Sequence, residues 1–78
     1  MIELENGAKV ILWVGNAECG VVLADSGDAY AVWYSPGIDA ASGKAFCVHG
    51  EYFPKAPYSL DNAINRFWDR ANENGFTP

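Results

Sequence analysis

Two residues near the middle of the chain, Cys47 and His49, are of types that can carry out nucleophilic chemistry. Residues two apart on a β-strand share a face and lie about 6.5 Å apart along it, so a thiol and an imidazole could meet at one site. A catalytic dyad also needs an orienting group and donors for a developing oxyanion, and the sequence contains a recognisable motif for neither. We therefore expect this protein not to be an enzyme and assign no catalytic residue.

A metal site could be drawn from the same two residues and Cys19, which together offer three ligands for zinc. Structural zinc sites use a close pair of the Cys-x-x-Cys type, and this chain has none. Acidic residues that could act in pairs all fall in expected turns, where acids are common for local hydrogen-bonding reasons. These are Glu18, Asp25, Asp28 and Asp39. The glycines match no phosphate-binding loop, and the sequence predicts neither a metal nor a cofactor.

The chain has 78 residues, with ten acidic and five basic side chains and a net charge of −5. This charge disfavours direct binding to nucleic acid, which requires clustered Lys and Arg. It suits a protein partner with a basic surface, and it equally suits solubility alone. No apolar run is long enough to span a membrane, and the acidic start, residues 1–5, is unlike a secretory signal. We expect a cytoplasmic protein whose two cysteines stay reduced.

The periodicity of the first 53 residues predicts a sheet. Runs rich in β-branched and aromatic residues cover 9–14, 19–24, 29–34 and 44–49, the last continuing towards 53, and Gly, Asn, Asp and Pro separate them. Asn6-Gly7 is a strong hairpin signal and predicts that a further strand pairs at the start. Because the connections are too short for parallel crossovers, we expect an antiparallel meander of four or five strands.

The last part of the chain predicts one amphipathic helix over residues 59–74, after a proline-containing linker at 54–58. Ser59 is a suitable N-cap, and Asn74-Gly75 predicts a Schellman end that returns Phe76 to the last turn near Ala71. The apolar positions fall on one stripe: Leu60, Ala63, Ile64, Phe67, Trp68 and Ala71. The fold class is therefore α+β, a single domain over 1–78 with the helix packed on one face of the sheet.

Both faces of the predicted sheet are apolar, whereas one helix about 10 Å across covers one face at most. The second face is therefore expected to lack a cover, and Trp and Tyr are enriched at binding hot spots. The candidate partner-binding residues are the aromatic Trp13, Tyr30, Trp33, Tyr34 and Tyr52 and the acidic loop residues Asp25, Asp28 and Asp39. The alternative is that these rings enlarge a core too small to be built from aliphatic side chains.

The very short acidic chain, its aromatic sheet and the segments Gly50-Glu51-Tyr52-Phe53 and 59–67 resemble accessory proteins of phages and mobile elements, among them anti-CRISPR proteins. The resemblance implies a stoichiometric inhibitor of a host defence or nucleoprotein complex, present in the host cytoplasm if phage-encoded. We therefore expect a non-enzymatic protein-binding module. The alternative is a small-ligand-binding or self-associating protein, such as a homodimer whose sheets enclose a pocket lined by Trp13, Trp33 and Tyr30.

Overall fold

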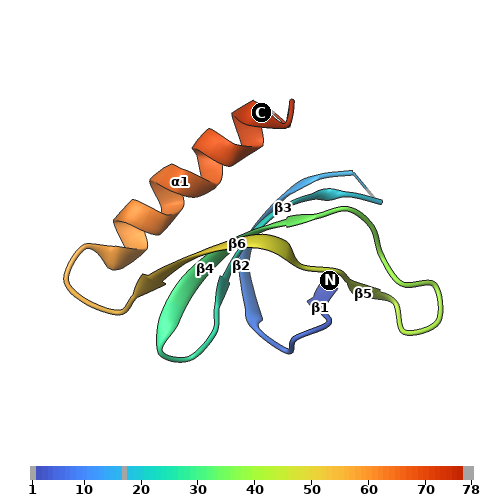
Figure 1. Ribbon diagram of the computed structural model, residues 1–78, viewed down its shortest axis with the longest axis horizontal. Helices are drawn as coiled ribbons and strands as arrows, with labels where there is room; N and C mark the ends of the chain where they lie inside the picture. The colour runs from blue at the N-terminus through green and yellow to red at the C-terminus, as the bar shows by residue number, and fades with distance from the viewer. Residues whose placement is uncertain (1, 17, 77–78) are drawn as a thin grey trace.

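The computed structural model describes residues 2–16 and 18–76. Its main sheet and its helix confirm the α+β class (Figure 1). The elements are β1 (Glu3–Leu4), β2 (Lys9–Gly15), β3 (Gly20–Asp25), β4 (Ala29–Ser35), β5 (Lys44–Ala45), β6 (Val48–Pro54) and α1 (Ser59–Glu73).

The main sheet is a four-stranded antiparallel meander in the order β2-β3-β4-β6, as the short connections predicted. β3 is central, and its residues Gly20 to Ala24 are all buried. The predicted strand over 44–49 is wrong in one respect, because the chain breaks at Phe46 and Cys47 into the separate strands β5 and β6. In the order of the main sheet, the outer strands are β2 and β6.

The expected hairpin at Asn6-Gly7 is wrong, although the turn itself forms. Gly7 has φ 77°, and its N–H donates to the carbonyl of Leu4 at 3.1 Å. The strand before the turn does not pair with β2; it forms a small parallel sheet with β5, with Leu4 beside Ala45. This parallel pair needs no local crossover, because the whole β2–β4 meander connects its two strands.

The helix α1 crosses β3, β4 and β6 and buries Ala63 and Phe67 against Val21, Leu23 and Val32. Ala71, one turn after Phe67, is also fully buried. The predicted stripe is correct at its centre and too wide at its margin. Trp68 is 37% exposed, and Leu60 is exposed to a similar extent. The helix thus turns its Phe67 side to the sheet and leaves one flank partly open.

The two ends of α1 differ in how well the sequence predicted them. Ser59 is not the N-cap: Tyr58 holds that position with φ 68°, and the Ser59 hydroxyl instead donates to the carbonyl of Ala56 at 2.8 Å. The Schellman end is confirmed, with Gly75 at φ 80° and the Phe76 N–H donating to the Ala71 carbonyl at 2.8 Å. Phe76 packs against the core on the helix side.

The expectation of an uncovered second face is wrong. Leu4 of β1 and Ala45 of β5 are buried on that face with Val22, Ala24, Ala31 and Trp33, and Ile2, Ile38 and Cys47 pack around them. The small parallel sheet therefore covers the face that the helix leaves open. The protein has two apolar layers, one on each side of β3, because segments without regular periodicity supply the second cover.

Candidate functional site

The structure separates the five predicted aromatic residues. Tyr30 and Tyr34 pack on the helix side of the sheet, whereas Trp13 and Trp33 pack on the opposite side, here called the helix-free face. Trp33 is 5% exposed and Tyr52 is 59% exposed; the other three rings are partly buried. Most of these rings therefore enlarge the core, and Tyr52 is the one that stands open to solvent.

Tyr52 is held by a contact with Trp33 below it. Their ring centroids lie 5.7 Å apart at an interplanar angle of 83°, and the Trp33 Nε1–H donates to the Tyr52 hydroxyl at 3.2 Å. Gly50 makes room for this pair, because a Cβ there would lie 2.5 Å from Nε1 of Trp33. An exposed ring whose hydroxyl is already fixed loses little freedom when it binds.

A cleft of about 560 Å³ opens beside this pair on the helix-free face. In the register of the sheet, Tyr52 lies beside Ala31, which lies beside Ala24 and then Val10. Ala31 and Ala24 are fully buried under the small parallel sheet and do not line the cleft, whose aromatic wall is Trp33 and Tyr52. The remaining walls are two turns, and the lining residues are Asn6, Gly7, Ala8, Lys9, Asp25, Ser26, Gly27, Trp33 and Tyr52. We call this hollow the Trp33–Tyr52 cleft.

Of the three predicted acidic residues, Asp25 reaches the cleft. Its carboxylate accepts from the Gly27 N–H at 2.8 Å and pairs with Lys55 at 2.9 Å. The Gly27 hydrogen bond and then Lys55 hold the pKa of Asp25 below its usual value, so the carboxylate stays charged. Asp28 lies in the adjoining turn and is exposed.

Asp39 lies in a different loop, before β5, and does not line the cleft. Its carboxylate accepts from the Ser42 N–H at 2.9 Å, and the Ser42 hydrogen bonds lower the pKa of Asp39. This acid has the local turn-forming role that is common for Asp. The structure therefore brings together Trp33, Tyr52 and Asp25 and leaves Asp39 apart.

The two residues that could have done chemistry do not share a strand face. Cys47 precedes β6, and His49 is exposed in a left-handed conformation with φ 54°. Burial, and next the Glu5 carboxylate, raise the pKa of the Cys47 thiol to about 11. A thiol with that pKa is a poor nucleophile at neutral pH. Among the described residues, no group of three or more His, Cys, Asp or Glu is placed to hold a metal ion.

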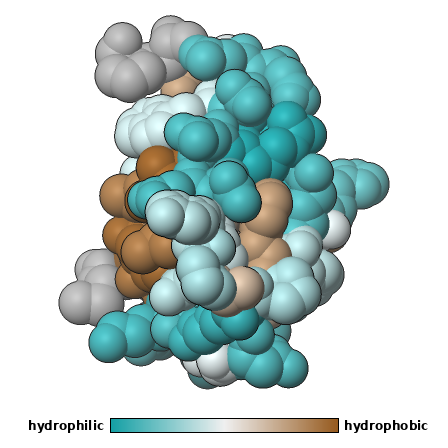
Figure 2. Space-filling model, turned by 90° about the vertical axis from the view of Figure 1, so that its left-hand side faces the viewer, coloured by the Kyte–Doolittle hydropathy of each residue, from teal (hydrophilic) through white to brown (hydrophobic). Residues whose placement is uncertain are grey.

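A second surface, which the sequence analysis missed, lies at the β2 edge. We define the β2-edge patch as Ile11, Leu12, Leu60, Ile64 and Trp68. Unlike β3, β2 has no residue that reaches full burial, and Ile11 is 41% exposed. On the helix, Arg66 and Arg70 face Glu51 of β6, so helical spacing turns Ile64 and Trp68 towards β2. Figure 2 shows hydrophobic residues gathered on that side, at the left of the view.

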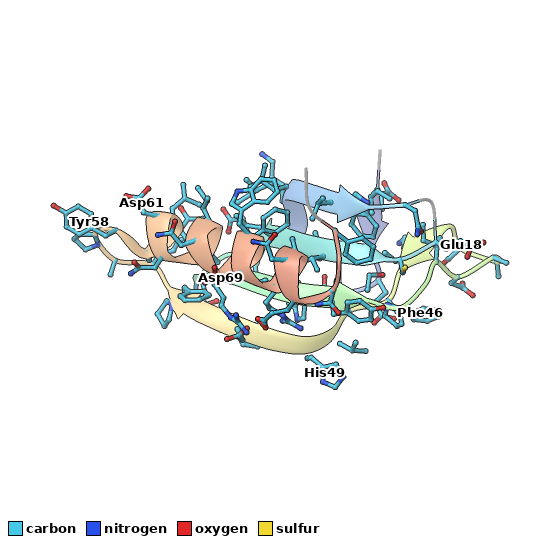
Figure 3. The ribbon with its side chains drawn as sticks, turned by 90° about the horizontal axis from the view of Figure 1, so that it is seen from above. Glu18, Phe46, His49, Tyr58, Asp61 and Asp69 are labelled. Atoms are coloured by element: carbon cyan, nitrogen blue, oxygen red, sulfur yellow. The ribbon has the colours of Figure 1, made fainter. Side chains whose placement is uncertain are left out.

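The β6 edge is constructed differently. The ladder between β4 and β6 is irregular between Val32 and Tyr34, where a bulge admits the side chain of Trp33. Arg70 is buried below this bulge, and its Nη1 donates to the carbonyls of Val32 at 3.1 Å and His49 at 2.5 Å. Arg66 joins Glu51 at 2.7 Å and Glu73 at 2.9 Å. Figure 3 shows β2 and β6 at opposite sides of the sheet, with the side chain of His49 on the outer side of β6.

Comparisons with models of protein families, with curated proteins and with solved structures found no match to this chain. Within the part of the chain that the structure describes, no helix is long and apolar enough to cross a membrane. Two surfaces of the molecule are candidates for function: the Trp33–Tyr52 cleft and the β2-edge patch.

Proposed function

We propose that this protein is a non-enzymatic protein-binding module that receives a side chain of its partner in the Trp33–Tyr52 cleft. The observation that carries the proposal is Tyr52, a 59% exposed ring fixed by the Trp33 Nε1–H at the mouth of the cleft. Tyr residues held in this way are typical anchors of protein interfaces, because they offer a large contact area at a low cost in entropy.

The partner that fits best presents a basic surface. The net charge of −5 attracts such a surface from a distance. Asp28 is exposed beside the cleft, and the lowered pKa of Asp25, which lines the cleft, keeps that carboxylate charged. The resemblance to anti-CRISPR proteins extends this proposal to a stoichiometric inhibitor of a host defence or nucleoprotein complex. Such complexes hold nucleic acid on basic surfaces, which an acidic module can cover.

A second candidate function is the binding of a small ligand in the same cleft. Its volume of about 560 Å³ falls within the range of small-molecule sites, and it combines aromatic and polar walls. The two candidate functions differ in what is bound. A protein-binding module forms a complex with a second protein, whereas a ligand-binding protein retains a small molecule after all other proteins have been removed.

The test compares Tyr52→Glu with Tyr58→Glu. Both replace an exposed tyrosine, but Tyr58 is 78% exposed in the linker and does not line the cleft. Tagged wild-type protein is used to isolate a partner from extracts of candidate hosts, and the purified pair is then titrated by calorimetry. We expect binding near one-to-one for wild type and Tyr58→Glu, and a loss of at least about 2 kcal/mol in affinity for Tyr52→Glu.

Equal binding by the wild type and Tyr52→Glu would contradict the role of the cleft. Native mass spectrometry of freshly purified protein covers the second candidate. A small molecule retained by the wild type and lost in Tyr52→Glu, with no protein partner recovered, would favour the ligand-binding function instead.

A further inference from the structure

We propose that the β2-edge patch is an interface with a second copy of this chain, in which β2 pairs antiparallel with β2 of the other copy about a two-fold axis. The two four-stranded sheets then become one sheet of eight strands. This inference goes beyond the proposed function, because it uses the β2 edge, which shares only Lys9 with the lining of the Trp33–Tyr52 cleft, and leaves Tyr52 accessible on β6.

β2 is an edge strand of the main sheet. β2 has seven residues and pairs with β3 on one side; on its other side, the described residues supply no strand that is hydrogen-bonded to it. An exposed strand edge of this length carries a row of backbone donors and acceptors that can pair with another strand. Lys9, at one end, is the single charged side chain within β2.

The two ends of β2 carry opposite charges. Lys9 begins the strand, and Glu18 is exposed in the turn just after it ends at Gly15. Among the residues described, neither Lys9 nor Glu18 forms a salt bridge, although Lys9 lies beside Asp25 in the ladder between β2 and β3. In an antiparallel pair centred on Leu12, Lys9 of each copy lies beside Gly15 of the other, within reach of its Glu18. The same ion pair therefore forms twice.

Apolar side chains of the β2-edge patch are partly exposed to solvent. A two-fold axis perpendicular to the sheet keeps both α1 helices on one face. On each helix, Ile64 packs in the same cluster as Leu12 of β2, and Trp68 lies one turn further along the same side and is 37% exposed. Ile11 and Leu12 then lose their exposure to water at the centre of the interface. Interfaces between identical copies are typically self-complementary in this way, with an apolar centre and charges at the rim.

Sedimentation velocity over a concentration series tests the proposal, with circular dichroism as a check on folding. The wild type is expected to change from monomer to dimer as its concentration rises. Ile11→Lys is expected to raise the dimer dissociation constant by about tenfold or more, since it places two like charges at the centre of the interface. Phe46→Lys is the matched control: Phe46 is also exposed but lies outside β2, and its variant should dimerise like the wild type.

A charge swap tests the register of the pair. Lys9→Glu or Glu18→Lys alone should weaken the dimer, and the double variant should restore it. A monomer at every concentration, or a dimer that Ile11→Lys and Phe46→Lys weaken equally, would overturn the proposal. A dimer whose singly reversed variants are unchanged would overturn the antiparallel register. Binding of the partner at Tyr52 is measured separately and is expected to be the same in Ile11→Lys and the wild type.

Discussion

The two outer strands of the sheet, β2 and β6, each have an edge whose backbone groups lack a neighbouring strand among the described residues, and they differ in how that edge is protected. β6 carries a bulge, ends in Pro54, and has Arg70 donating to two carbonyls beneath it. β2 also has an irregular register, between Val10 and Leu12, but it keeps an apolar sequence and lies beside the open flank of α1. Bulges, prolines and charges are the usual protections of an exposed edge. Both strands have an irregular register and one charged residue, Lys9 in β2 and Glu51 in β6, whereas Pro54 and the contact with Arg70 belong to β6 alone.

This difference limits how copies can associate. If both edges were open, strand pairing would continue from copy to copy and form an open filament. If copies pair through β2 alone, association stops after two copies. The comparison therefore connects a local feature, the buried Arg70 under the bulge, to the assembly of the whole protein.

The largest expected effect compares two neighbouring residues of α1, the buried Phe67 and the partly exposed Trp68. Phe67→Ala removes a fully buried ring and is expected to lower the free energy of unfolding by about 3–5 kcal/mol. Trp68→Ala is expected to cost less, about 1–2 kcal/mol, because over a third of its surface is exposed; the edge-to-face contact with Phe67, at 4.8 Å between ring centroids, is part of that loss. Urea unfolding measures both. Equal losses would show that Trp68 belongs to the core and not to the β2-edge patch.

The next effect concerns the closure of β6. Arg70→Met removes the donors to the carbonyls of Val32 and His49 and is expected to cost about 3 kcal/mol, because buried acceptors are left unpaired. Arg66→Met is the matched control, since its ion pairs with Glu51 and Glu73 are partly exposed and worth about 1 kcal/mol or less. Chemical denaturation of the two variants compares them. A smaller loss for Arg70→Met than for Arg66→Met would contradict the assigned role of Arg70.

A smaller effect tests the bulge that admits Trp33. Gly50→Ala places a Cβ 2.5 Å from Nε1 of Trp33 and is expected to cost about 1–3 kcal/mol as the indole shifts. Gly37→Ala is the control, since the nearest atom to its Cβ is 3.8 Å away. Thermal unfolding gives the stabilities, and tryptophan fluorescence reports the displacement. An unchanged spectrum and melting temperature for Gly50→Ala would show that the indole is not confined there.

The smallest effect is a pH dependence at Asp25, the last residue of β3, which pairs with Lys55 just after β6. The pKa of Asp25 is lowered in the folded protein, so its contribution to stability is present above the unfolded value and is lost as pH falls through the folded value, below about pH 4. Asp25→Asn should lose less stability than the wild type over that interval. Unfolding midpoints measured between pH 5 and the acid limit of folding make the comparison. Parallel curves for the two proteins would refute this assignment.

The sequence predicted the parts of the fold that local patterns determine. The meander follows from β-branched runs separated by turn residues, and the helix end at Gly75 follows from Asn74-Gly75. The pairing of β1 with β5 could not be predicted, because a two-residue strand has no periodicity and its partner lies far away in sequence. The cover on the helix-free face was missed for the same reason.

The candidate site was predictable in part. Tyr52 was one of five aromatic candidates. That it is exposed while Trp33 is buried depends on the bulge at Gly50, which only the pairing of β4 and β6 specifies. The β2-edge patch depends on where α1 lies across the sheet. The amphipathic stripe gives the apolar side of a helix but not the strands that it crosses, so Trp68 and Leu60 were assigned to the core.

The comparison of the two edges is tested most directly by amide hydrogen exchange at low and high protein concentration. If β2 pairs with a second copy while β6 stays closed, the outward-facing amides of β2 become protected as the concentration rises, and those of β6 do not change. The same experiment on Ile11→Lys should show no such protection. Concentration-dependent protection in β6, or none in β2 at concentrations where the protein sediments as a dimer, would contradict this account.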